Sequence, residues 1–417
     1  MKILIINQSD IDGGAARATY RIASGLVNKN INVNMLVMRK LGFDKWVIGP
    51  NSIFSYLVLR CFPRLDWISQ ILLGVRKGFS WSLNLLPNPL LDEIFFNQFD
   101  VVHLNWIGKN MIPIQWLEKI KSPIIWTLHD SWAFTGGCHV PFSCDRFKEA
   151  CGNCPQLMKP NINDVSNSAL MKKISVYKGL KIHFVAPSNW MAQHARLGAA
   201  LSNMPVTVIP NGLDTNLYKP YEKLNSRELL SLPKNKFIIL FGAMNAHIDP
   251  NKGLDLFFES MEIFANENSS LSKDCCIVVF GVDKSKLPEF SAIPIHSLGV
   301  IKNDIQLARI YSSADLTVMP SRSESFGQVA LESISCGIPV VCFKTTGLID
   351  IVEHLKTGYL AECFNTTDLA RGIKLMLSNP ILLKEMSTLA RLKAVEIFDI
   401  NVISTLYANL YAQVSKV

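Results

Sequence analysis

The sequence has no run of about 18 uncharged apolar residues, the length that a membrane-spanning helix requires. It also has no charged and then apolar leader with a small-residue cleavage site, so we expect no secretion signal. Charged residues make up only 18% of the chain and hydrophobic residues 49%, which excludes disorder as a description of the whole chain. No internal repeat and no low-complexity segment is present. The 417 residues are therefore expected to form two globular domains.

Two ligand classes are disfavoured by missing motifs. No G-x-G-x-x-G sequence follows the first strand of either half, which argues against a nicotinamide-dependent dehydrogenase. No recognition helix, zinc finger or aromatic sheet motif accompanies the positive charge, so nucleic acid is not an expected partner.

Short runs of Val, Ile and Leu alternate with longer helical patterns along the chain. Apolar strands spaced by helices are typical of parallel sheets covered on both faces. Two such sets, divided at Pro210-Asn211-Gly212, indicate an α/β fold with two doubly wound, Rossmann-like domains. We expect domains over residues 1–209 and 210–399, and a last helix over about 400–417 is a candidate to pack on the first. The expected strands are 2–7, 32–38, 101–105, 123–129, 182–188, 206–211, 236–243, 275–281, 293–299, 316–321 and 338–343.

Positive charge is concentrated in the first half. Residues 1–210 hold 22 basic and 12 acidic side chains, and the remainder hold 20 and 22. Residues 39–77 alone hold seven basic and two acidic ones. Basic residues interleaved with apolar side chains suit a surface that lies on anionic lipid. The alternative is that the charges form a solvated face and the apolar side chains occupy ordinary core positions. The apolar side chains interleaved with these charges are Trp46, Phe54, Tyr56, Leu57, Phe62, Trp67, Ile71 and Leu72.

The segment 321–341, SRSESFGQVALESISCGIPVV, carries the most informative pattern. Glu324 and Glu332 are eight residues apart, so on one helix they would face the same way, about 12 Å apart along its axis. That separation of the two carboxylates matches the distance between a sugar and a ribose at the two ends of a diphosphate. Backbone N–H groups at a helix start bind phosphates, and we expect such a start at Ser325, Phe326, Gly327 and Gln328. The alternative is a surface helix with two solvated glutamates.

This segment resembles the Glu-x7-Glu signature of retaining glycosyltransferases of family 4, which have the GT-B fold. Further matching segments follow the same order: SDIDGGAARAT (9–19), IIWTLHD (124–130), VAPSNW (185–190), VIPNGLDTNLYKP (208–220), PNKGLDLF (250–257), 296–327 and 347–360. The resemblance spans nearly the whole chain. It implies two Rossmann-like domains facing each other across a cleft, and an enzyme that moves a hexose, with retention, from a nucleoside-diphosphate sugar to a glycan acceptor.

The resemblance also implies roles for individual residues. His129, Glu324 and Lys252 would be catalytic: His129 faces the donor sugar, Glu324 binds its hydroxyls, and Lys252 neutralises the diphosphate. Glu332 would hold the ribose. His103 lies at another expected strand end and is a second candidate. The remaining expected donor contacts are Gly13, Gly14, Asn245, Ser325, Phe326, Gly327 and Gln328.

One departure from the family concerns the diphosphate. The family usually has an arginine just after the first strand of the second domain, but no arginine lies between Phe241 and Lys252. Asn245 or His247 would have to replace it. The departure leaves open the alternative that the chain is a non-catalytic subunit that binds a sugar nucleotide. A further alternative is a sugar-nucleotide epimerase with the same fold.

Four cysteines fall close together in the sequence, with the spacing C-x5-C-x6-C-x2-C: Cys138, Cys144, Cys151 and Cys154. Four thiolates can hold a structural zinc ion, and C-x2-C is a usual half-site. Disulfides or redox thiols, and unpaired packed thiols, are the alternatives. The family mechanism implied by the resemblance requires no cofactor, so we expect none for catalysis.

The acceptor and the location are inferred from charge and from the absent leader. A chain that has ten cysteines and no expected secretion leader suits a reducing compartment. A basic first domain suits a cytoplasmic enzyme that works at the inner face of the plasma membrane, where an anionic surface is a candidate partner. The expected acceptor is a glycan or lipid-linked glycan in bacterial surface polysaccharide synthesis, such as an exopolysaccharide or lipopolysaccharide.

Overall fold

The structure is a computed structural model that describes residues 1–50, 52–86, 88 and 91–416, with the backbone alone in 53–56 and 58–60. The chain forms two compact units. Unit 1 comprises Met1–Gly212 and Ile403–Val417, and unit 2 comprises Leu213–Val402. Each unit is described by itself below.

The described part of unit 1 contains a parallel sheet in the order β3-β2-β1-β4-β5-β6-β7. Ile5 of β1 lies opposite Met35 of β2 and His103 of β4, so the chain order reverses between β1 and β4. In such a sheet, ligands bind beyond the carboxyl ends of the strands at that reversal. The strands are β1 (Lys2–Ser9), β2 (Asn32–Arg39), β3 (Val47–Ile48), β4 (Val101–Leu104), β5 (Ile124–Thr127), β6 (Ile182–Ala186) and β7 (Val206–Val208).

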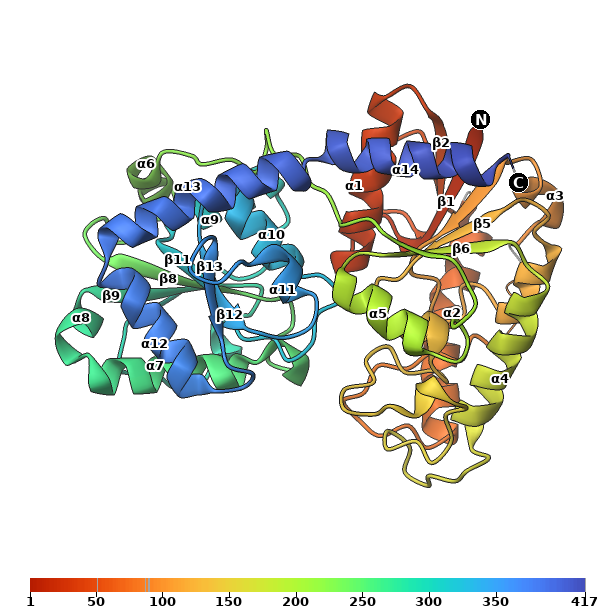
Figure 1. The fold of residues 1–417 in the computed structure, drawn as a ribbon, viewed down its shortest axis with the longest axis horizontal. Coiled ribbons are helices and arrows are strands. Elements are labelled where there is room, and N and C mark those ends of the chain that lie inside the picture. The colour runs from red at the N-terminus through yellow and green to blue at the C-terminus, as the bar shows by residue number, and fades with distance from the viewer. Residues whose placement is uncertain (51, 87, 89–90, 417) are drawn as a thin grey trace. The chain divides into compact units, whose positions relative to one another are not determined.

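Helices cover both faces of this sheet because its strands are apolar on both sides. Ile3 and Ile5 pack on one face with α1 and α14, while Leu4 and Ile6 belong to the core on the other face. The C-terminal helix α14 is therefore part of unit 1 (Figure 1). The helices are α1 (Gly14–Asn28), α2 (Ile53–Leu72), α3 (Glu93–Phe96), η1 (Ile114–Lys119), η2 (Trp132–Phe134), η3 (Arg146–Lys148), α4 (Val165–Lys178), α5 (Asn189–Leu197) and α14 (Ile400–Val414).

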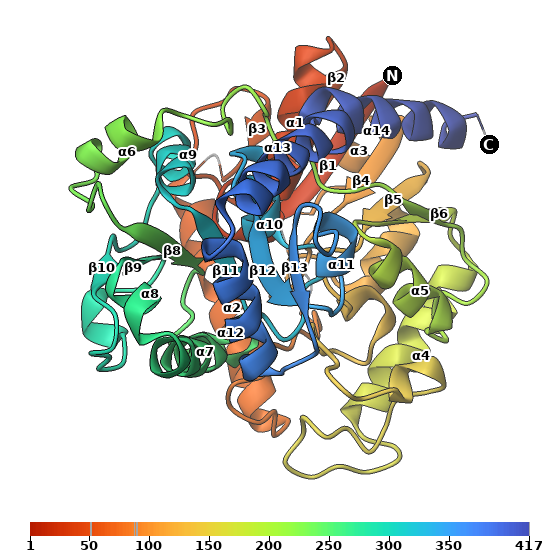
Figure 2. The same ribbon diagram turned by 60° about the vertical axis from the view of Figure 1, so that its left-hand side comes forward.

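Unit 2 repeats the same topology with a parallel sheet in the order β10-β9-β8-β11-β12-β13 (Figure 2). The order reverses between β8 and β11, where Leu316 lies opposite Ile239. The strands are β8 (Phe237–Gly242), β9 (Cys275–Phe280), β10 (Ile295–Ser297), β11 (Leu316–Met319), β12 (Val340–Phe343) and β13 (Gly358–Ala361).

The two faces of the unit 2 sheet are covered by different helices. Helices α7 and α12 pack on one face and α9 and α10 on the other, while α13 contributes to both cores, through Met386 on the first and Ala390 on the second. The helices of this unit are α6 (Lys223–Leu229), η4 (Pro250–Lys252), α7 (Leu254–Glu267), α8 (Ser269–Lys273), η5 (Lys284–Lys286), α9 (Asp304–Ser313), α10 (Gln328–Ser335), α11 (Leu348–Ile351), α12 (Thr366–Leu377) and α13 (Pro380–Ile397).

The expected α/β fold of two doubly wound domains is confirmed. The sequence analysis did not predict β3 and β13, which are only two and four residues long. In the part of the chain that the structure describes, no helix is long and apolar enough to cross a membrane.

Candidate functional site

The reversal of strand order in unit 2 brings two loops together. The loop after β8 ends in the 3₁₀ helix η4, and the loop after β11 spans Pro320 to Gly327. These are the loops of the two neighbouring strands at which a doubly wound sheet binds its ligand. Both loops carry residues expected to contact the donor.

Lys252 and Glu324 meet where these two loops adjoin. Lys252 Nζ donates to Glu324 Oε1 at 2.8 Å, and both side chains remain partly exposed. Burial alone would lower the pKa of Lys252, but the Glu324 carboxylate raises it above its usual value, so the amine stays charged. The structure therefore brings together a fixed cation and a carboxylate acceptor, the two groups that a diphosphate and a sugar hydroxyl require.

The expectation that Glu324 lies on a helix with Glu332 is wrong. Helix α10 begins at Gln328, and Glu324 belongs to the preceding loop. Its backbone N–H donates to Thr346 Oγ1 at 2.9 Å, and its carbonyl accepts from Gly347 N–H at 2.9 Å. The loop is held against the β12–α11 connection by these bonds, so the distance along a helix axis does not describe the separation of the two glutamates.

The helix start expected at residues 325–328 is present. Gly327 is the N-cap of α10, with a φ of +119°, and no side chain caps the helix there. A Cβ at this position would lie 2.7 Å from Leu348 Cδ2, so both the backbone conformation and the packing require glycine. The N–H groups of a helix's first turn have no acceptor within the helix, which makes this end of α10 suited to an anion.

Glu332 has a different environment from Glu324. Its side chain is buried, and its Oε2 accepts a hydrogen bond from the Tyr311 hydroxyl at 3.0 Å. Burial, and then the Glu332 charge, raise the pKa of Tyr311 well above its usual value, so the phenol stays protonated as the donor. The role of Glu332 at a ribose stays a prediction.

Two residues that the sequence analysis missed position the Lys252–Glu324 pair. Asn251 donates through its side-chain Nδ2 to Ser323 O at 2.6 Å, and its backbone carbonyl accepts from Arg322 N–H at 2.8 Å. Arg322 forms an ion pair of 2.6 Å with Asp255 at the start of α7. These bonds link the β8 and β11 loops directly. The motif positions 250–257 and 321–327 were recognised, but the bonds between them cannot be read from spacing.

The residues considered as substitutes for the missing arginine are on the surface. Asn245 is exposed, has a φ of +57°, and donates its backbone N–H to Gly281 O at 3.2 Å. His247 is exposed as well. Neither forms part of the Lys252–Glu324 contact, and their expected role at a diphosphate stays a prediction.

In unit 1 the glycine loop follows β1 and is held by Asp10. The buried Asp10 carboxylate accepts from the backbone N–H groups of Leu41 at 2.9 Å and Gly42 at 2.7 Å, which fixes the loop against the β2–β3 connection. Gly13 has a φ of +99° and nothing lies within 4 Å of a Cβ built there. Gly13 and Gly14 are exposed at the N-terminus of α1. Open space at this helix start leaves room for a ligand.

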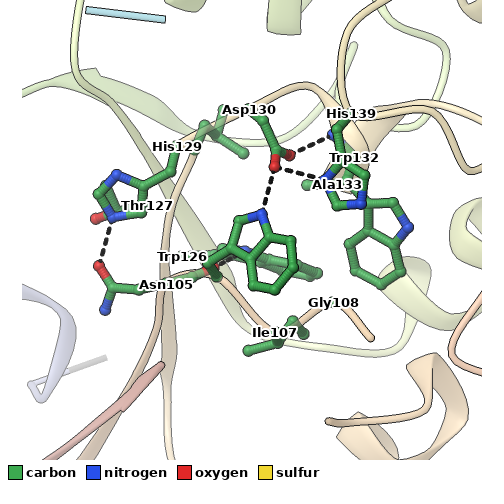
Figure 3. Close-up of a pocket in the computed structure, with 12 residues that line it drawn as sticks. Asn105, Ile107, Gly108, Trp126, Thr127, His129, Asp130, Trp132, Ala133 and His139 are labelled. Carbon is green, nitrogen blue, oxygen red and sulfur yellow. Dashed lines mark hydrogen bonds and ion pairs between the residues drawn. The ribbon is translucent and has the colours of Figure 1, made fainter. Parts of the chain in front are cut away.

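His129 lies two residues beyond the end of β5 and lines a small pocket (Figure 3). Its Nε2 is 2.9 Å from Asn105 Oδ1, beyond the end of β4, and 3.4 Å from Thr19 Oγ1 of α1. Burial lowers the pKa of His129 to about 4, so the imidazole is neutral near pH 7. The structure thus places His129 at the carboxyl edge of the sheet beside α1.

A second group of side chains in this pocket surrounds Asp130 (Figure 3). Its Oδ2 accepts from Trp106 Nε1 and from His139 Nδ1, both at 2.6 Å, and its Oδ1 accepts from Trp132 N at 2.8 Å. Burial would raise the pKa of Asp130, but the His139 imidazole and these donors hold it below its usual range. In the sequence analysis Asp130 appears only as the last residue of the matching segment 124–130.

His103 is a structural residue. Its side chain is fully buried, with Nδ1 2.7 Å from the Tyr411 hydroxyl and Nε2 2.8 Å from Thr127 Oγ1. Burial lowers its pKa to about 3. Because both ring nitrogens are bonded within unit 1, His103 joins α14 to the sheet and is not available to a ligand.

The four clustered cysteines are free thiols, as are the other six. Cys138 and Cys154 are buried, and burial raises the pKa of Cys151 to about 12. Among the described residues no three His, Cys, Asp or Glu side chains are arranged to hold a metal ion. The zinc site stays a prediction, and metal analysis after reducing, chelator-free purification tests it: less than about a tenth of an equivalent of zinc would remove it.

Solved glycosyltransferases share the whole two-unit fold. Sucrose-phosphate synthase from Thermosynechococcus elongatus superimposes with a TM-score of 0.70 at 17% identity, over 99% of this chain and 98% of that one. Anabaena Alr3699/HepE, solved in complex with UDP-glucose, gives a TM-score of 0.66 at 17% identity, over 99% and 100% of the two chains. At this identity the likeness defines the fold, which is the GT-B fold of glycosyltransferases.

Sequence comparison gives the family. Residues 12–217 match "Glycosyltransferase Family 4", and residues 223–393 match "Glycosyl transferases group 1". The chain belongs to glycosyltransferase family 4. A curated relative, D-inositol 3-phosphate glycosyltransferase of Thermobispora bispora, is 31% identical over 195 residues, which is 44% of each protein. A second, from Segniliparus rotundus, is 30% identical over 48% of this chain and 46% of the relative. This chain therefore matches about half the length of these relatives.

Proposed function

We propose that the protein transfers a sugar, with retention of anomeric configuration, from a nucleoside-diphosphate sugar to a glycan acceptor. The observation that carries the proposal is the contact between Lys252 and Glu324 at the strand-order reversal of unit 2, next to the start of α10. The charged amine suits the departing diphosphate, and the carboxylate suits a sugar hydroxyl. No metal is needed for either contact.

Unit 1 supplies groups suited to the reacting sugar and the acceptor. His129 is neutral near pH 7, and with Asn105 Oδ1 as the acceptor of its Nε2 proton, Nδ1 keeps a lone pair for a sugar hydroxyl. The exposed glycines at the start of α1 allow close approach of a ligand to the backbone. We propose that unit 2 binds the donor and unit 1 the acceptor.

A lipid-linked oligosaccharide of bacterial surface polysaccharide synthesis is the proposed acceptor, at the inner face of the plasma membrane. The positive charge of residues 1–210 supports this, because membranes with anionic lipid attract basic surfaces. A solved relative supports the donor class, since Anabaena Alr3699/HepE was crystallised in complex with UDP-glucose.

A panel of UDP-, GDP- and ADP-sugars tests the proposal, first by calorimetric binding and then by turnover with lipid-linked acceptors. NMR of the product reports whether the anomeric configuration is kept. Binding without transfer to any acceptor would favour a non-catalytic subunit, an alternative suggested by the absence of arginine between Phe241 and Lys252. Conversion of the donor alone into a second sugar nucleotide would identify an epimerase.

A further inference from the structure

Helix α2 presents an apolar face to solvent. Trp67 is 60% exposed and Leu72 is 80% exposed, and the exposed fractions of their neighbours are also large. Positions 57, 64, 68, 71 and 72 recur with the helical period, so they share one side of the helix, and Leu65 and Trp67 lie at its two edges. We name this side the α2 face. Its large apolar members are Leu57, Leu65, Trp67, Ile68, Ile71 and Leu72.

The opposite side of the helix is anchored to unit 1. Phe62 is buried in the unit 1 core, and Asp66 is fully buried. The Asp66 carboxylate accepts from Gln70 Nε2 at 2.8 Å and from the Leu83 backbone N–H at 3.4 Å. Because these contacts fix the rotation of the helix about its axis, the α2 face cannot turn inward to bury its own apolar side chains.

The exposed charge along this segment of the chain has one sign. Over residues 61–77 the only acidic side chain is Asp66, and burial raises its pKa. Arg64, Arg76 and Lys77 are exposed along the same segment. A solvated helix surface usually mixes both signs of charge with few large apolar groups. Exposed tryptophan and aliphatic side chains among basic residues are instead typical of helices that lie at an anionic membrane surface.

We propose that the α2 face is a membrane-docking surface that binds anionic phospholipid. The apolar side chains enter the boundary between headgroups and acyl chains, with the Trp67 indole at the level of the headgroups. The Arg64 stem packs along this apolar surface while its guanidinium reaches the lipid phosphates, which Arg76 and Lys77 also attract. The side chains of Phe54 and Tyr56, on the same helix, lie outside the described residues.

The inference rests on the proposed function only in that a lipid-linked acceptor gives the docking a purpose. Donor binding by the full chain in solution is measured separately, so a failure of either proposal is recognised by itself. If the donor does not bind but vesicles do, the docking surface stands and the glycosyltransferase proposal falls. If the donor binds equally well to every α2 variant, the docking surface is distinct from the donor site.

Vesicle flotation of the full chain tests the surface. We expect flotation with vesicles of phosphatidylcholine and phosphatidylglycerol, and little with phosphatidylcholine alone. The triple variant Trp67→Ser, Ile71→Ser and Leu72→Ser should weaken binding about tenfold or more, because it removes three apolar anchors. The pair Arg64→Gln and Lys77→Gln should weaken it at low salt and make it less sensitive to added salt.

A matched control removes exposed apolar residues from unit 2. Ile381 and Leu392 of α13 are 74% and 49% exposed, and Ile381→Ser with Leu392→Ser should float like the wild type. Equal flotation with neutral and anionic vesicles, or no loss in the triple variant, would overturn the proposal. A dimer in solution that the triple variant dissociates would assign the α2 face to a second copy of the chain and also overturn it.

Discussion

Lys252 Nζ lies 2.8 Å from Glu324 Oε1, although 72 residues separate the two in sequence. The pair joins the loops after β8 and β11, the neighbouring strands at which the order of the unit 2 sheet reverses. In the absence of a donor each group neutralises the other. A bound sugar diphosphate would give Lys252 a phosphate partner and Glu324 a hydroxyl partner, so the contact prepares both side chains for their proposed ligands.

The first prediction concerns this pair. Lys252→Met and Glu324→Gln should each lower kcat of the proposed transfer by about 10²–10³, because each removes one preorganised electrostatic contact. A double-mutant cycle should show non-additive losses, since the two groups touch. Turnover of the best donor of the nucleotide-sugar panel is the measurement.

Lys223→Met is the matched control. Lys223 forms an ion pair of 2.9 Å with Asp315 in the same unit, on the opposite, amino-terminal side of β11. Its loss should leave kcat within about twofold, because Asp315 lies far from the proposed donor contacts and keeps its ion pair with Arg227. Unchanged turnover in both Lys252→Met and Glu324→Gln would contradict the proposed donor site.

The second prediction concerns the glycine at the start of α10. Gly327→Ala should destabilise the region by about 1–3 kcal/mol, because the φ of +119° is strained for alanine and its Cβ would meet Leu348. Hydrogen exchange of peptides covering residues 321–335 should quicken, and donor affinity should fall. Gly299→Ala is the control, since Gly299 also has a positive φ but nothing lies within 4 Å of its Cβ. Equal effects of the two substitutions would show that the contact with Leu348 has no consequence.

The architecture of each unit was predictable because its signals are local. Apolar strands, the turns between them and the apolar periodicity of helices each occupy a few neighbouring residues, and the parallel order of the sheets follows from their alternation. The start of α10 at Gln328 was also a local feature, because Gly327 has no side chain to oppose the backbone turn. The same local character explains why the two-residue strand β3 was missed: Val47–Ile48 is too short to carry a period.

The details of the candidate site depended on contacts between distant segments. Glu324 was placed on a helix because its spacing from Glu332 allowed it, whereas Thr346 and Gly347 hold it in a loop. His103 looked like a ligand-facing residue at a strand end, but its partner Tyr411 lies 308 residues further on. Such bonds are created by tertiary packing, and residue spacing contains no record of them.

The third prediction concerns the stability of unit 1 at acidic pH. The native pKa of His103 is about 3, against 6.5 for a histidine in the unfolded chain. Between these values the unfolded state binds a proton that the native state does not, so stability is fully present above pH 6.5 and falls as the pH drops toward 3. Each such histidine contributes a slope of about 1.4 kcal/mol per pH unit. His129, with a pKa of about 4, acts in the same direction.

Replacing His103 by glutamine should therefore reduce the slope of the unfolding free energy against pH between pH 6 and 4. The expected reduction is about 1.4 kcal/mol per pH unit, which corresponds to one proton. Tryptophan fluorescence measures unit 1 alone, because all eight tryptophans lie between residues 46 and 190. His247→Gln, at an exposed position in unit 2, is the control and should leave the slope unchanged. An identical slope in His103→Gln and the wild type would mean that His103 is protonated in the native protein.

The last prediction concerns Asp130. Asp130→Asn keeps the size of the side chain but turns an NH₂ group toward donors, since all three of its partners, Trp106, Trp132 and His139, donate to the carboxylate. One of these buried bonds must be lost, which should destabilise unit 1 by about 1–3 kcal/mol and shift the tryptophan emission.

Asp145→Asn separates this effect from a general loss of negative charge in the same region. Asp145 is 67% exposed and pairs with Lys148 at 2.7 Å, so its substitution should change the stability of unit 1 by less than about 0.5 kcal/mol. Because Asp130 and His129 are adjacent and line the same pocket, Asp130→Asn should also lower turnover of the proposed transfer more than it affects donor binding to unit 2. A loss confined to donor affinity would contradict the proposed role of His129 in the transfer.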